Sequence, residues 1–147
     1  MQGRTFRGQS PDGTWHEGFL IRSPGVKNSR PGEGWYINSE NEPAYAHLVK
    51  PFTIGMSTGV KDMEGTMVFE GDIIKTTGPN ERIFSVEFGE YMAYGVGHIG
   101  FYAKIAGKNS CDYKPCCLRA LLYIGKVVGN MSDTPYLMKE AGEEQKK

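Results

Sequence analysis

Glycine and proline are spread so evenly along this 147-residue chain that it has no room for a long uninterrupted helix. The chain holds 20 Gly and 8 Pro, and the longest segments free of both, 80–88 and 116–124, are nine residues long. A transmembrane helix needs about 20 consecutive apolar residues. Inside a helix each Gly costs about 1 kcal/mol and each Pro about 3 kcal/mol. The spacing therefore argues against membrane spans, coiled coils and long-helix bundles, and it favours strands joined by turns.

The side chains between these breaks favour β structure. Val, Ile, Thr and the aromatic residues number 42, against 13 for Ala and Leu together. We expect a mainly β protein with curled, SH3-like or barrel-like antiparallel sheets, in a single domain over residues 1–138. Its parts would be an N-terminal β lobe over 1–77 and a C-terminal β lobe over 78–130. A short helix over about 134–141, with Thr134 as its N-cap, would follow, and then a flexible tail over 142–147.

Local patterns place individual elements. Strands are predicted around a Ser10–Gly13 turn, and alternation of apolar and polar residues predicts another at 82–88. Residues 22–34 are predicted to form a long loop, and Gly71 with Asp72 a tight turn or a bend. The segment 116–123 fits either a helix or a buried strand.

The charge is balanced overall but unevenly distributed. Seventeen basic and seventeen acidic side chains give a formal net charge of zero, so no strongly basic composition points to nucleic acid. Residues 60–90 carry a net charge of −4 and residues 91–129 a net charge of +4. These stretches fit solvated faces, or two surfaces that face each other within the fold or across a symmetric interface.

The N-terminal residues and the cysteines indicate a reducing compartment. The sequence begins MQGRTFRG, without the apolar core of a secretory signal. Its three cysteines are an odd number, and Cys116 and Cys117 are adjacent. We expect reduced thiols in a cytoplasmic protein that does not associate with a membrane.

Several short motifs suggest chemistry but lack its context. Gly95–Gly100 matches G-x-G-x-x-G, yet strand residues follow it and position 120 is Ala, so we expect a glycine-rich turn. Cys111, Cys116, Cys117 and His98 lack the usual ligand spacing of a zinc site. The three histidines, His16, His47 and His98, are scattered, and no nucleophile motif accompanies them. We expect no catalytic residues, no metal site and no cofactor.

The basic stretch 91–129 is a candidate nucleic-acid surface. Cations interleaved with aromatic rings are how β-barrels hold single strands, although a half-buried sheet shows the same alternation. The residues we expect to make such contacts are Lys104, Lys108, Lys114, Arg119, Tyr102 and Tyr113.

Three segments together resemble the YopX-like proteins of bacteriophages and prophages. Residues 58–75 read TGVKDMEGTMVFEGDIIK, which resembles the family signature TGLKDKNGKEIYEGDIVK. Residues 6–21 are similar to its FRG…GEW…G.LI start, and 127–137 to its VIGNIYENPELL end. Val60 stands for the common Leu, 67–69 read MVF where the family has EIY, and the cysteine-rich stretch 111–122 matches no part of the pattern.

The resemblance implies a small, mostly β, phage-associated protein that is often oligomeric, and it brings no catalytic residues with it. The central motif consists of glycines, turn acids and alternating apolar residues, which specify a fold more often than a site. Its signature positions, which we expect to be structural, are Gly59, Asp62, Gly65, Glu70, Gly71 and Asp72.

Three functional hypotheses follow. The first is a non-enzymatic phage accessory protein in the host cytoplasm that acts through protein contacts as a homo-oligomer, with a phage or host protein as a further partner. The second is a nucleic-acid-binding module that uses the basic aromatic stretch. The third is an enzyme with an unfamiliar carboxylate site between Asp62 and Asp72.

Overall fold

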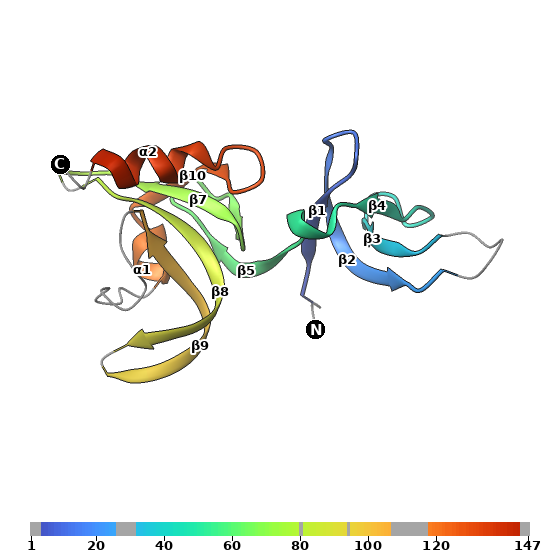
Figure 1. Ribbon diagram of the computed structural model, residues 1–147, viewed down its shortest axis with the longest axis horizontal. Coiled ribbons are helices and arrows are strands. Elements are labelled where there is room, and N and C mark those ends of the chain that lie inside the picture. Colours follow the sequence, from blue (N-terminus) through green and yellow to red (C-terminus); the bar gives the residue numbers. More distant parts are fainter. Residues whose placement is uncertain (1–3, 26–31, 80, 94, 107–117, 145–147) are drawn as a thin grey trace. The chain divides into compact units, whose positions relative to one another are not determined.

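The computed structural model describes residues 4–25, 32–79, 81–93, 95–106 and 118–144 (Figure 1). The chain divides into two compact units, Met1–Ser57 and Thr58–Lys147. The described residues form two antiparallel sheets, in the strand orders β4-β3-β2-β1-β5-β6 and β10-β7-β8-β9. Strand β5 (Gly55–Lys61) begins in the first unit and ends in the second.

The first unit is a small sheet built from hairpins. Its elements are β1 (Phe6–Gln9), β2 (Trp15–Ser23), β3 (Gly34–Asn38), β4 (His47–Val49) and the 3-10 turn η1 (Pro51–Thr53). The turn between β1 and β2 is closed by a hydrogen bond from the Gly13 N–H to the Ser10 carbonyl, 2.9 Å, and Gly13 has φ 91°. A left-handed residue of this kind favours glycine, so the predicted turn is present.

The apolar core of the first unit is thin. Ile37 in β3 and Val49 in β4 are its buried hydrophobic side chains among the described residues. On the opposite sheet face, Phe19, Ile21 and Leu48 are exposed. The register pairs Ile21 with Tyr36, and Tyr36 with Leu48, so these side chains share one face. We call Phe19, Ile21, Tyr36 and Leu48 the β2–β4 face.

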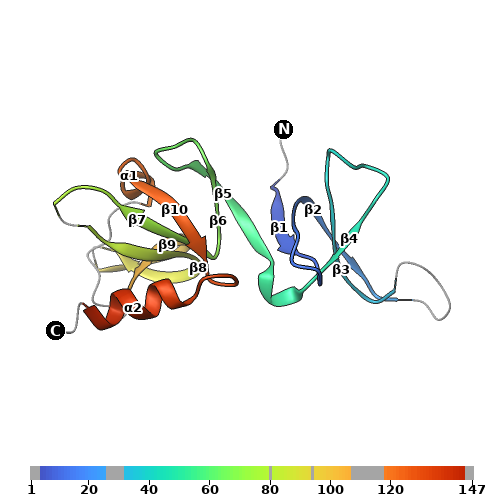
Figure 2. The same ribbon diagram turned by 90° about the horizontal axis from the view of Figure 1, so that it is seen from above.

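The second unit carries the larger core. Its elements are the second half of β5, then β6 (Met67–Phe69), β7 (Asp72–Thr76), β8 (Ile83–Ala93), β9 (Val96–Ile105), α1 (Leu118–Leu122), β10 (Gly125–Asn130) and α2 (Tyr136–Glu144) (Figure 2). Alternate residues of β8 and β9, such as Phe84 and Ile105, pack with Ile74 of β7 and Leu122 of α1. The helix α1 resolves the choice left open for 116–123 in favour of a helix at its described residues.

The prediction of a mainly β chain with a short C-terminal helix is confirmed. The prediction of curled, barrel-like sheets is wrong, because both sheets are open: one ends at β4 and β6, the other at β10 and β9. Residues 58–77 were assigned to the N-terminal lobe, but β7 pairs with β8 and β10, so the boundary at 77/78 falls inside the second unit.

The predicted bounds of several elements also shift. Strand β8 extends past the predicted 82–88 to Ala93 and forms a long hairpin with β9, and α2 continues to Glu144, into the segment expected to be a tail. Strand β2 extends to Ser23, and residues 26–31 of the predicted loop lie outside the described residues. No helix of the described residues is long and apolar enough to cross a membrane.

Candidate functional site

The signature segment 58–75 is built on three glycines in the left-handed region. Gly59, Gly65 and Gly71 have φ values of 76°, 82° and 92°. Residues other than glycine rarely adopt these φ values. Gly65 closes a turn in which its N–H donates to the Asp62 carbonyl, 3.1 Å. The glycine spacing of the motif therefore has a backbone reason.

Asp62 ties this turn to the last strand. Its side chain is 7 % exposed, and its Oδ1 accepts the N–H groups of Glu64 and Thr66, each at 2.9 Å. Its Oδ2 accepts the Val127 N–H of β10, also at 2.9 Å. Burial is the largest influence on its pKa and raises it, but the backbone donors together outweigh burial and hold the pKa below 3.8. The ionised carboxylate is thus a crosslink between segments 65 residues apart.

Asp72 has a comparable place at the start of β7. Its side chain is 1 % exposed, and its Oδ2 accepts the Phe69 N–H at 2.8 Å. The preceding Gly71 donates its N–H to the Val86 carbonyl, 2.7 Å, and accepts the Met131 N–H, 2.8 Å. Glu70 is half-buried between these turns. The carboxylates of Asp62 and Asp72 therefore hold backbone groups in place and do not line an open site.

The structure describes only some of the residues predicted to contact nucleic acid. Tyr102 and Lys104 lie on β9 and Arg119 on α1; Lys104 and Arg119 are exposed. The Tyr102 hydroxyl donates to Glu87 Oε2 at 3.0 Å; burial first, and this carboxylate second, raise its pKa. An acid therefore lies beside the predicted aromatic platform. Lys108, Tyr113 and Lys114, like Cys111, Cys116 and Cys117, lie outside the described residues.

The same hairpin has one polar aromatic face. Tyr91 lies opposite His98, and their rings stack at 5.4 Å; Tyr91 also contacts the Tyr102 ring at 5.4 Å. Cross-strand ring pairs of this kind stabilise a two-stranded ribbon. The G-x-G-x-x-G motif ends in this face, in β9, so the predicted turn is limited to Gly95 and the segment holds no helix that could bind a dinucleotide.

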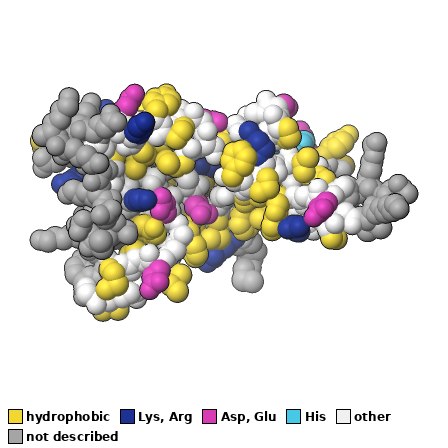
Figure 3. All heavy atoms as spheres, in the orientation of Figure 1, with side chains coloured by type: hydrophobic (Ala, Val, Ile, Leu, Met, Phe, Trp, Pro, Cys, Tyr) yellow, Lys and Arg dark blue, Asp and Glu magenta, His cyan; other side chains and the backbone are white. Residues whose placement is uncertain are grey.

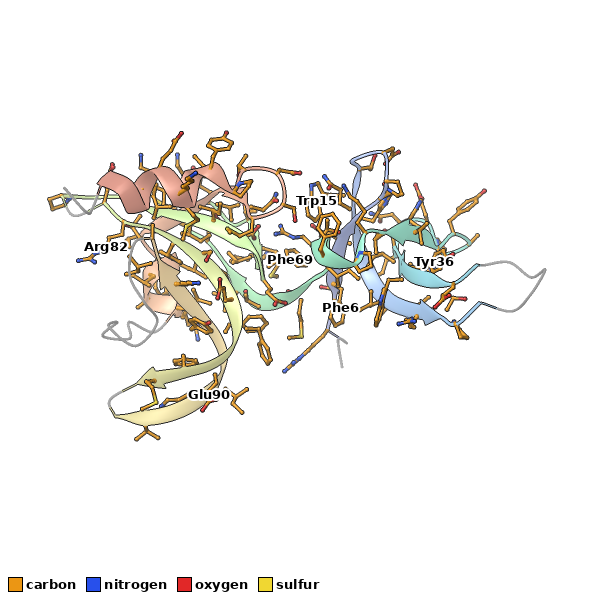
Figure 4. All side chains as sticks on the ribbon, in the orientation of Figure 1. Phe6, Trp15, Tyr36, Phe69, Arg82 and Glu90 are labelled. Carbon is orange, nitrogen blue, oxygen red and sulfur yellow. The ribbon has the colours of Figure 1, made fainter. Side chains whose placement is uncertain are left out.

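The opposite face of the hairpin is apolar and exposed beyond the core. Phe88, Met92 and Ile99 are 43 %, 48 % and 80 % exposed. Phe101 pairs with Phe88, and their rings meet edge to face at 5.0 Å. Glu90 lies opposite Ile99 on the long hairpin (Figure 4), and Figure 3 shows several apolar side chains on the surface at this end of the second unit. We call Phe88, Glu90, Met92, Ile99 and Phe101 the hairpin face.

The sequence contained a signal for this face that its charge pattern obscured. The alternation at 82–88 continues with the same parity through Glu90 to Met92, and Ile99 and Phe101 return it on β9.

A second cluster joins two histidines that are distant in sequence. His16 of β2 and His47 of β4 stack with ring centroids 3.9 Å apart and an interplanar angle of 10°. His47 Nε2 lies 2.7 Å from Glu42 Oε2, and His16 Nε2 lies 3.2 Å from Ser10 Oγ. Burial first and His47 second lower the pKa of His16 below 6.5, against Asp12 and Glu42, which raise it. No spacing rule would have linked these positions.

This cluster is not a hydrolytic triad. In a triad the histidine lies between the nucleophile and the carboxylate. Here the candidate nucleophile, the buried Ser10 hydroxyl, lies between His16 and Asp12. It donates to Asp12, and His16 contacts the same oxygen. Among the described residues, no group of three His, Cys, Asp or Glu side chains is arranged to hold a metal ion.

Comparison with known proteins agrees with the motifs. A family model described as YopX protein matches residues 22–139, more than three quarters of the chain. A search of curated proteins found no match to the chain. The matched segment contains the signature turn around Asp62, the hairpin, and the β10 strand that Asp62 holds. The chain therefore belongs to the YopX family.

Proposed function

We propose that this chain is a non-enzymatic, phage- or prophage-encoded accessory protein of the bacterial cytoplasm, which acts through protein contacts as a homo-oligomer. The hairpin face is the proposed contact surface between copies. The observation that carries the proposal is the exposed apolar side of β8 and β9, which continues the buried core row of Phe84 and Val86 outward to Phe88 and Met92.

The exposed part of the hairpin would be stabilised by contact with another protein surface. Beyond the core it is a two-stranded ribbon, and an isolated ribbon is at best marginally stable in water. Aromatic contacts stabilise the ribbon on one face, but on the other face Ile99 and Met92 are exposed to solvent. Contiguous exposed apolar side chains rimmed by polar groups are typical of protein contact surfaces.

A second copy is the occupant that the chain itself favours. The hairpin face holds one charged residue, Glu90, so an apolar surface of the same composition complements it without opposite charges. The net charge is zero, so copies do not repel one another over distance. The β2–β4 face of the first unit offers a second exposed apolar surface, with Phe19, Ile21 and Leu48 each close to half exposed.

The carboxylates support a binding protein over an enzyme. Asp62 and Asp72, the most buried acids of the signature, accept backbone N–H groups, and the pKa of Asp62 is lowered, away from the range of a general acid. Glu87, which accepts from the Tyr102 hydroxyl, works against an anionic ligand on the aromatic face.

Native mass spectrometry of the full chain, purified gently from its bacterial host, tests the proposal. Masses at integer multiples of 16.3 kDa are expected. A monomer that retains nothing at micromolar concentration would overturn the proposal. Additional mass that nuclease removes would replace it with the nucleic-acid reading, in which Lys104→Glu weakens binding and salt weakens it steeply.

A further inference from the structure

We propose that the stacked pair His16 and His47 is a proton-operated clasp, which holds the β3–β4 hairpin onto β1 and β2 near neutral pH and releases it when the His16 imidazole is protonated. The inference concerns the first unit and is independent of the hairpin face.

The clasp joins two parts of the first unit that the sheet order separates. His16 is the second residue of β2 and lies opposite Gly8 of β1, and His47 begins β4, opposite Ile37 of β3. Strand β4 is a three-residue edge strand, so its ladder has few hydrogen bonds. The ring contact at 3.9 Å adds to the pairing with Ile37 and the Glu42 contact that hold its first residue.

The charged groups around the pair determine its response to protons. The β1–β2 turn presents Asp12, which accepts from the Ser10 hydroxyl and from the Thr14 N–H at 3.1 Å. The β3–β4 loop presents Glu42 to His47. Gly8 and Ile37, opposite the two histidines on β1 and β3, carry no charge, and Lys50 directs its ammonium over Phe52 at 5.7 Å.

The two imidazoles have unequal partners. A proton on His47 completes an ion pair with Glu42 at 2.7 Å, whereas His16 faces a hydroxyl oxygen. Because the Ser10 hydroxyl gives its hydrogen to Asp12, its oxygen accepts from the His16 Nε2–H of the neutral ring. Burial, and then the His47 ring stacked 3.9 Å away, disfavour a proton on His16 and so lower its pKa.

Opening the clasp exposes the thin core. Val49, two residues after His47, packs against Gly8, whose substitution by any side chain would place a Cβ 2.9 Å from the Val49 Cβ. Ile37 lies directly opposite His47. The pKa of His16 is below its unfolded value, so the folded first unit is favoured above about pH 6.5 and loses stability as the pH falls through the folded value.

Hydrogen exchange of the full chain between about pH 7.5 and about pH 5.5 tests the clasp, with labelling times scaled to the intrinsic exchange rate at each pH. We expect the protection of the β3 and β4 amides to fall over this range, because protonation of His16 favours the open form. Amides of β7 and β8 should keep their protection over the same range.

Matched variants separate the clasp from general acid sensitivity. His16→Phe keeps a flat ring on His47 but cannot take a proton, and His47→Gln keeps a hydrogen-bonding group near Glu42. Both should lose the pH dependence of β3 and β4, whereas His98→Gln, in the second unit, should retain it. An unchanged pH dependence in His16→Phe and His47→Gln, or none in the parent chain, would overturn the proposal.

Discussion

At the scale of single residues, the signature of this family is explained by backbone hydrogen bonds. Asp62 is the clearest case, because one carboxylate accepts N–H groups from its own turn and from β10. Its neighbour Glu64 is exposed and contributes its backbone N–H to that network. The sequence indicated a turn here, since acids beside glycines commonly form turns. It could not indicate Val127 as the third donor, because that contact depends on the whole second unit.

Asp62→Asn should lower the free energy of unfolding of the second unit by about 1–3 kcal/mol, because the amide nitrogen would face the Val127 N–H, donor against donor. Glu64→Gln on the same turn is the matched control and should change little. Urea unfolding at neutral pH measures both. Equal stability of Asp62→Asn and the parent would contradict a structural role for the carboxylate.

The pH dependence gives a second test of the same side chain. The pKa of Asp62 is held below 3.8, so the carboxylate stabilises the fold above that pH and this contribution is lost as the pH falls through the folded value. The parent chain should lose stability more steeply below about pH 4 than Asp62→Asn does. Parallel acid titrations of the two proteins would refute this if their stability curves have the same slope.

At the scale of elements, the strands were predictable and their partners were not. Alternation placed β8, and the turn residues placed β1 and β2, because these signals are local. Sheet closure, the unit boundary and the approach of β4 to β2 depend on long-range pairing, which a single sequence does not encode locally. The connection from β10 to α2 is intermediate, because Thr134 predicted a helix start but not its close approach to Gly129.

Gly129 lets α2 pack closely on β10. A Cβ there would lie 2.0 Å from Thr134 Oγ1 and 3.1 Å from Leu137 Cδ1. The Thr134 hydroxyl bonds both backbone groups of Asn130, at 3.0 and 3.1 Å. Gly129→Ala should therefore cost about 1–3 kcal/mol by overpacking. Gly100→Ala in β9, with no neighbour within 4 Å, should be neutral or slightly stabilising in the same thermal unfolding series; equal costs for the two variants would count against close packing at Gly129.

At the scale of the whole molecule, the two units differ in their cores. The first holds two of the buried hydrophobic side chains among the described residues, Ile37 and Val49, and the second holds twelve. Small units with thin cores are marginally stable. We therefore expect the first unit to unfold before the second, so the chain should not be two-state.

The two tryptophans make this difference measurable. Trp15 and Trp35 both lie in the first unit, while α1 and α2 both lie in the second. Tryptophan fluorescence should therefore report a transition at lower urea than the helical circular dichroism signal does. Coincident transitions from the two probes would show that the units unfold together, against this expectation.

The most direct test of the central claim is sedimentation of the full chain over a concentration series, compared with Ile99→Lys. This variant places a cation opposite Glu90, so it should preserve the hairpin while removing the most exposed apolar side chain of the hairpin face. Tyr136→Glu, at an exposed position of α2, is the control. The account predicts a parent oligomer, an unchanged control, and a shift of Ile99→Lys toward the 16.3 kDa monomer. A monomeric parent, or an Ile99→Lys variant that assembles as the parent does, would contradict it.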